Sequence, residues 1–69
     1  MQIYDLTVPE LERYRNHCNF LDDELDYFNL KSRGKSNASI SIELNVSEAQ
    51  VSKIAKRVKD KIDRLDKIV

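Results

Sequence analysis

The sequence predicts an all-α protein, a small helical domain with a helix-turn-helix and an extended C-terminal helix. Three observations predict this fold class. The 69 residues include one glycine and one proline, so long stretches lack helix breakers. Apolar residues recur every three or four positions, which is the spacing of one helix face. Capping residues precede these stretches. We therefore expect four helices and little or no sheet.

The length predicts a single domain over residues 1–69. A core of this size supplies only a few kcal/mol, so self-association is expected to add stability. One cysteine, Cys18, excludes an internal disulfide and indicates a reducing compartment, although a disulfide between chains stays open. No apolar run approaches the roughly 20 residues that span a bilayer, and the N-terminus lacks a basic start before an apolar block. We expect a cytoplasmic protein that is neither secreted nor inserted in a membrane.

The first helix is expected over residues 8–19. Thr7 is its N-cap, Glu10 completes a capping box, and Pro9 lies in the first turn, where its missing N–H costs little. One apolar stripe recurs at helical spacing, formed by Leu11, Tyr14, Cys18 and Leu21.

The second helix is expected over residues 22–33, and Gly34 ends it. Its acidic first turn suits the positive end of the helix dipole, and Lys31 and Arg33 suit the negative end. The positions expected to face the core are Leu25 and Phe28, flanked by Tyr27 or Leu30. A single longer helix that runs through Phe20 is also compatible with the pattern.

Residues 36–58 carry the pattern of a helix-turn-helix. Ser36 caps a helix in which Ile40 and Leu44 share one face. Asn45 follows where the turn needs a residue that tolerates positive φ. Because only about three residues separate the two helical patterns, the turn is tight.

The helix after this turn begins at a second capping box, Ser47 with Gln50, and has no stop signal before the last residue. Its inward positions are Val51, Ile54 or Ala55, and Val58. Residues 59–69 extend it. The apolar stripe has alternating spacings of four and three residues, an a/d heptad pattern, and comprises Val51, Ala55, Val58, Ile62, Leu65 and Val69.

The stripe has two possible partners, the first helix of the same chain or the same tail of a second chain. Roughly three heptads is short for an independent coiled coil. Packing within the chain explains the upper part of the stripe but less easily Leu65 and Val69. We therefore expect a homodimer, with an interface formed by Val58, Ile62, Leu65 and Val69.

The net charge is zero, but the charges are unevenly distributed. Residues 1–30 hold two basic and seven acidic residues, a balance of minus five. Residues 31–61 hold eight basic and three acidic residues, a balance of plus five. Positive charge therefore gathers on the helix-turn-helix, where nucleic acid binding would use it.

The segment Ile40-Ser41-Ile42-Glu43-Leu44-Asn45-Val46-Ser47-Glu48-Ala49-Gln50-Val51-Ser52 resembles the helix-turn-helix shared by sigma factor region 4 and response-regulator output domains of the quorum-sensing type. The basic link over residues 30–37 is similar to the one that precedes that motif. The resemblance covers roughly residues 21–58 of the 69. Two positions depart from it: Ser41 replaces a usual alanine, and Asn45 replaces a usual glycine, the residue for which Asn is the next choice in a left-handed turn.

The resemblance implies a stand-alone transcription regulator of phage or mobile-element scale, bound to duplex DNA as a dimer or in a complex with RNA polymerase. It also implies that Ser52, Lys53 and Lys56 face DNA, which agrees with their periodicity. The second helix of such a motif reads base edges in the major groove, and flanking groups bind phosphates. The expected base-reading residues are Glu48, Ala49, Gln50, Ser52, Lys53 and Lys56. The expected phosphate contacts are Lys35, Ser36, Asn37 and Arg57.

Catalytic and metal-binding patterns are weak, and we expect neither an enzyme nor a cofactor. His17 and Cys18 are adjacent on a helix, so their side chains diverge by about 100° and cannot pair as base and nucleophile. They also lack the ligand spacing of a metal site. The acidic group Asp22, Asp23, Glu24 and Asp26 is interpreted as a solvated helix start. An alternative function is a protein-interaction module whose acidic N-terminal half docks on a partner such as RNA polymerase.

Overall fold

The computed structural model describes residues 3–68 and confirms a four-helix, all-α domain. No strand occurs among the described residues. A short 3₁₀ turn, η1, precedes the helices. The elements are η1 (Ile3–Asp5), α1 (Val8–His17), α2 (Asp22–Ser32), α3 (Asn37–Leu44) and α4 (Glu48–Ile68).

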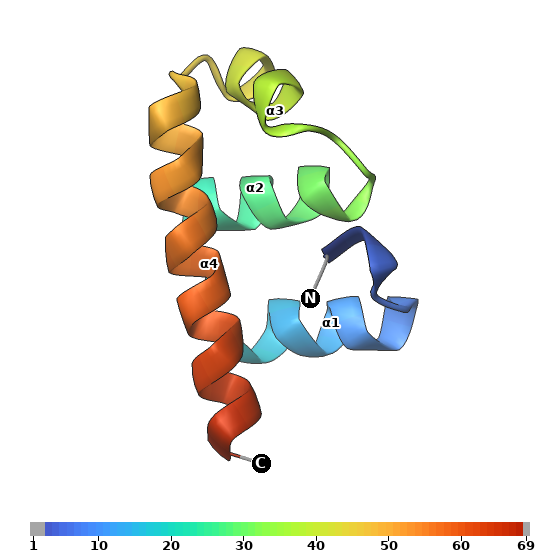
Figure 1. The fold of residues 1–69 in the computed structure, drawn as a ribbon. Coiled ribbons are helices and arrows are strands. Elements are labelled where there is room, and N and C mark those ends of the chain that lie inside the picture. The colour runs from blue at the N-terminus through green and yellow to red at the C-terminus, as the bar shows by residue number, and fades with distance from the viewer. Residues whose placement is uncertain (1–2, 69) are drawn as a thin grey trace.

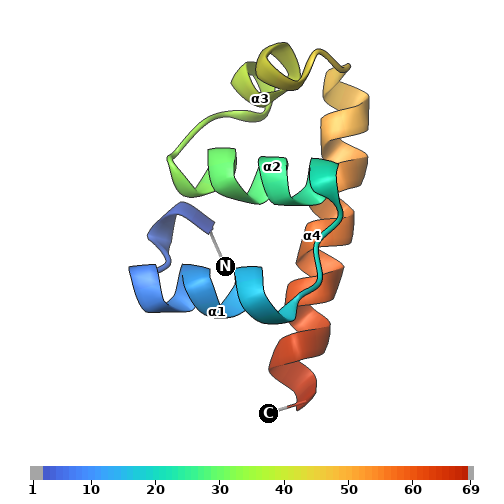
Figure 2. The same ribbon diagram turned by 180° about the vertical axis from the view of Figure 1, so that it is seen from behind.

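The long helix α4 is the spine of the molecule (Figure 1). Helices α1 and α2 lie side by side and cross α4, while α3 lies beside the N-terminal end of α4 (Figures 1 and 2). The domain measures 34 × 19 × 19 Å, so its long dimension is close to the length of about 31 Å expected for a 21-residue helix. The other three helices all pack along α4.

Helix α1 begins as the capping pattern predicts but ends two residues earlier than expected. The Thr7 hydroxyl accepts a hydrogen bond from the Glu10 N–H, and the Glu10 carboxylate accepts one from the Thr7 N–H at 3.1 Å. Cys18 is the C-cap, and Asn19 has a left-handed φ of 54°. Because a left-handed residue reverses the chain, α1 and α2 are separate helices rather than one helix through Phe20.

Helix α2 ends at Ser32, with Arg33 as its C-cap, one residue before the predicted end. Gly34 follows with φ of 83°, a conformation that side chains rarely adopt, and its N–H donates to the Lys31 carbonyl at 3.0 Å. The predicted role of Gly34 as the helix terminator is confirmed.

The core forms where the four helices meet, and the inward faces of α3 and α4 are confirmed. The fully or nearly fully buried apolar residues are Ile3, Tyr14, Cys18, Tyr27, Phe28, Ile40, Val51, Ile54, Val58 and Ile62. Two expectations for α2 are wrong. Leu25 is only half-buried, and Glu24, expected in solvent, is 1% exposed. Glu24 is buried because α4 crosses the start of α2 and brings the cationic side chains of Arg57 and Lys61 over its carboxylate.

The predicted dimer face is wrong for two of its four residues. Val58 and Ile62 are 0% exposed inside a single chain, and Leu65 packs on the same core. The C-terminal half of α4 is held by α1, since the Tyr14 hydroxyl donates to Asp66 at 3.2 Å. Val69 lies outside the described residues. The stripe is therefore covered within the chain along most of its length.

Candidate functional site

The turn between α3 and α4 positions the candidate site. Asn45 is left-handed, with φ of 56° and ψ of 47°, as the sequence predicts. The Val46 N–H then donates to the Ser41 carbonyl at 3.0 Å, which satisfies a carbonyl at the end of α3. The Ser47 hydroxyl accepts from the Gln50 N–H at 3.1 Å and caps α4. These local bonds fix the angle at which α4 leaves α3.

Helix α4 presents one apolar face and one polar face over its first three turns. Val51, Ile54 and Val58 point into the core. The outer face exposes five of the six expected base-reading residues, Glu48, Ala49, Ser52, Lys53 and Lys56, and Gln50 lies half-buried at its edge. The structure thus brings these side chains onto one accessible surface, which we call the outer face of α4.

A surface groove runs between the N-terminus of α3 and the outer face of α4. Its lining residues are Asn37, Ser52, Ala55, Lys56, Lys59, Asp60 and Asp63. Lys31 reaches the groove from α2, since its Nζ lies 3.3 Å from Asn37 Oδ1. Three residues predicted for two different roles therefore line one groove: Asn37, Ser52 and Lys56.

Lys59 is a groove residue that was not among the predicted site residues. It lies seven positions after Ser52 and three after Lys56, so all three share one helix face. This spacing is visible in the sequence and could have identified Lys59. Lys31 could not have been found in the same way, because it reaches Asn37 only through the packing of α2 against α3.

The remaining expected phosphate contacts on this side are Lys35 and Ser36, just before α3. The Ser36 hydroxyl accepts from the Ser39 N–H at 3.2 Å, which makes it the N-cap. The Lys35 ammonium lies 3.7 Å from Glu43, and both side chains are about half exposed. Such an exposed pair is weak, so Lys35 stays available to another anion.

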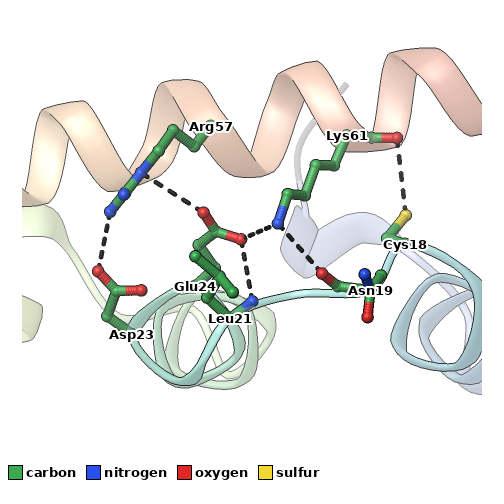
Figure 3. A network of polar contacts seen from close by, with 7 residues as sticks. All are labelled: Cys18, Asn19, Leu21, Asp23, Glu24, Arg57 and Lys61. Carbon is green, nitrogen blue, oxygen red and sulfur yellow. Dashed lines mark hydrogen bonds and ion pairs between the residues drawn. The ribbon is translucent and has the colours of Figure 1, made fainter.

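Arg57 lies on the opposite flank of α4 and does not share the groove. Its Nη2 contacts Asp23 at 2.8 Å, and its Nε lies 3.4 Å from Glu24 (Figure 3). Arg57 is exposed but already ion-paired within the chain, and its expected role as a phosphate contact stays a prediction. Its guanidinium is held by the first turn of α2.

Glu24 is the centre of this polar network between α2 and α4. Its carboxylate pairs with the Lys61 ammonium and accepts from the Leu21 N–H at 3.0 Å, as Figure 3 shows. Burial by itself would raise the pKa of Glu24. The hydrogen bonds from Lys61 and Leu21, together with the charges of Lys61 and Arg57, outweigh burial and hold the pKa of Glu24 below its usual value.

The same contacts reduce the negative charge that the N-terminal half presents to a partner. Asp23 and Glu24 are ion-paired with α4, so part of the charge asymmetry in the sequence is neutralised inside the molecule. No ion pair is recorded among the described residues for Lys53, Lys56 or Lys59. Lys53 and Lys56 on the outer face of α4 and Lys59 in the groove are positioned to meet an external anion, with Asp60 and Asp63 beside them in the groove.

The groups considered for catalysis or metal binding form no catalytic pair or ligand cluster among the described residues, although His17 and Cys18 border one hollow beside Lys61. His17 is exposed at the end of α1, whereas the Cys18 thiol is buried and lies 3.8 Å from the Lys61 carbonyl. Burial raises the pKa of Cys18, which disfavours the nucleophilic thiolate. Within residues 3–68, no cluster of three His, Cys, Asp or Glu side chains is arranged to hold a metal ion. None of the described helices is long and apolar enough to cross a membrane.

Comparison of the chain with protein-family models, with curated proteins and with solved structures yields no match. The features that bear on function are therefore the turn at Asn45, the outer face of α4 and the charges around them.

Proposed function

We propose that the chain binds duplex DNA sequence-specifically, as a small transcription regulator that places the first turns of α4 in the major groove. The observation that carries the proposal is the left-handed turn at Asn45. This turn places the polar, exposed face of α4 beside the N-terminus of α3. This is the arrangement by which a helix-turn-helix reads DNA, and a major groove about 12 Å wide admits a helix. A regulator of this kind acts in the cytoplasm.

Base reading falls to the exposed residues at the start of α4. Lys53 and Lys56 can donate to guanine O6 and N7, Glu48 can accept from cytosine N4, and the Ala49 methyl can contact a thymine methyl. Ser52 can donate or accept. Gln50 is less well placed because it lies at the half-buried edge of the face.

Phosphate binding falls first to the groove side of the motif. The free N–H groups at the start of α3, with Lys59 in the groove and Lys35 just before the helix, favour an anion there. Lys59 lies on the same face of α4 as Ser52. A DNA phosphate backbone that follows the protein groove at Asn37 would therefore pass near Lys59. These contacts set the register of the protein on DNA rather than its sequence preference.

A dimer on a two-fold site, or a complex with RNA polymerase, remains part of the proposal. Because Val58 and Ile62 are buried within the chain, only Leu65 and the end of α4 remain of the expected dimer stripe for self-association. Docking of a protein on the acidic half is the alternative function. It is less favoured, because Asp23 and Glu24 are paired with α4, which leaves fewer carboxylates for a partner.

The test is fluorescence anisotropy on a random pool of duplexes over a range of salt, followed by sequencing of the bound fraction. The proposal expects binding that weakens with a salt slope of several phosphates and an enriched motif. The absence of binding at low salt would refute it.

A matched pair of variants locates the DNA-binding surface. Lys53→Glu with Lys56→Glu reverses two charges on the outer face and should abolish binding. Arg64→Glu with Lys67→Glu makes the same change in charge on exposed positions farther along α4 and should leave most of the binding intact. Equal losses in the two variants would indicate attraction by net charge rather than a defined surface.

A further inference from the structure

We propose that the acidic start of α2 is an internal competitor for DNA: Asp23 holds Arg57 in a contact that a phosphate would otherwise make. This inference rests on the proposed function. It concerns an autoinhibitory contact that lowers affinity for any duplex, in contrast to the base-reading residues, which set sequence preference.

The geometry of the guanidinium supports the competition. The Nε and Nη2 groups of Arg57 form one edge of the planar guanidinium, and this edge binds a phosphate or carboxylate with two parallel hydrogen bonds. Here both donors face carboxylates, with Nη2 at 2.8 Å from Asp23 and Nε at 3.4 Å from Glu24 (Figure 3). Two carboxylates thus occupy the donors that a phosphate would take.

The position of Arg57 places it next to the proposed interface. It follows Lys53 by four residues, so the two side chains are neighbours on α4. With Lys53 in the major groove, Arg57 faces the adjoining backbone on the side away from the groove that contains Asn37. If Arg57 were released from α2, it would add a phosphate contact on the side of α4 opposite the Asn37 groove.

The exposure of the two acids identifies Asp23 as the residue that controls this release. The side chains of Asp23 and Arg57 are 44% and 45% exposed, so their pair is weak enough for DNA to displace. Glu24 is buried and keeps Lys61 and the Leu21 N–H as partners when Arg57 leaves. Arg57 can therefore exchange partners without leaving a buried charge unpaired.

The test is the substitution Asp23→Asn, with binding to one fixed duplex measured over a range of salt. Removal of the competing carboxylate should raise affinity about two- to fivefold, the strength of an exposed ion pair. The dependence of log K on log salt should steepen by about 0.9, the value for one additional phosphate contact.

Two further variants separate the contact from a general effect of charge. Asp26→Asn makes the same change in net charge, but Asp26 lines a different hollow, with Arg33 and Glu43. Its gain should be clearly smaller. Adding Arg57→Gln to Asp23→Asn should remove the gain and the steeper slope. Circular dichroism on each variant checks that the helices are intact.

The outcomes distinguish this inference from the proposed function. If the wild-type protein binds and Asp23→Asn gains no more than Asp26→Asn, or keeps its gain without Arg57, the competition is refuted and DNA binding stands. If neither the wild-type protein nor Asp23→Asn binds, the proposed function fails as well. If only Asp23→Asn binds, and needs Arg57 to do so, both proposals are supported and the inhibition is strong.

Discussion

The Glu24 carboxylate and the Lys61 ammonium form an ion pair across the interface between α2 and α4, although 37 positions separate them in the chain. Glu24 is 1% exposed, whereas the Lys61 side chain is 26% exposed and keeps some water. The pair fixes where α2 crosses the helix that carries the candidate site. Its effect on stability can be measured directly.

Glu24→Gln should lower the free energy of unfolding by about 2–3 kcal/mol, because loss of one partner from a buried pair leaves the other charge poorly compensated. The partial exposure of Lys61 places this value below that of a fully buried pair. Chemical denaturation followed by circular dichroism measures it. The control is Asp26→Asn, an exposed residue of the same helix, which should change stability by less than about 0.5 kcal/mol. Equal effects in the two variants would show that the Glu24 pair adds nothing specific.

The same residue predicts how stability depends on pH. The pKa of Glu24 in the folded chain is below its usual value of 4.5, so the unfolded chain binds the proton more readily. The stabilisation by Glu24 is therefore complete above about pH 4.5 and is lost as the pH falls through the folded pKa. Denaturation curves at a series of acidic pH values should show a steeper fall for the wild-type protein than for Glu24→Gln. Parallel curves would contradict the lowered pKa.

The turn at Asn45 offers a test of local backbone conformation. Asn45→Ala should lower the free energy of unfolding by about 1–2 kcal/mol, because alanine tolerates the left-handed region poorly. Asn45→Gly should change it by less than about 0.5 kcal/mol, since relief of strain and the greater freedom of unfolded glycine offset each other. Asn16 is the matched control: it is exposed within α1, and Asn16→Ala should be neutral or slightly stabilising. A similar response at both positions would contradict a special backbone at Asn45.

The covered stripe on α4 predicts the state of the free protein. Light scattering after gel filtration at tens of micromolar should report the 8.1 kDa mass of one chain, because Val58 and Ile62 are already buried within the chain. A mass of two chains would contradict this expectation, and Leu65 with the end of α4 is the first contact to test. In that event Leu65→Ser should return the protein to a single chain, whereas a persistent dimer would require another surface.

Much of the fold could be predicted because the signals that delimit the helices are local. The capping box of Thr7 and Glu10, the left-handed Gly34 and Asn45, and the cap at Ser47 each act within a few residues, so neighbouring positions in the sequence suffice to place them. The early end of α1 does not follow from the apolar spacing, because the left-handed Asn19 stops the helix while the apolar stripe continues to Leu21.

In the candidate site too, one part could be predicted from the sequence and another part could not. The outer face of α4 follows from helical periodicity alone, since residues opposite Val51 and Val58 are exposed wherever α4 packs. The groove at Asn37 needed the angle between α3 and α4, which the turn sets but the sequence pattern does not display.

By itself, the sequence determined the all-α class, the caps at Thr7, Ser36 and Ser47, the left-handed turn and the polar face of α4, because each depends on hydrogen bonds and spacings within a turn or two of helix. Only the tertiary structure decided the burial and ion pairs of Glu24 and Arg57 and the partner of the apolar stripe. The partners of these residues lie tens of positions away and meet them only when α1 and α2 cross α4. Whether a charged side chain on a helix faces water or an opposite charge depends on that crossing.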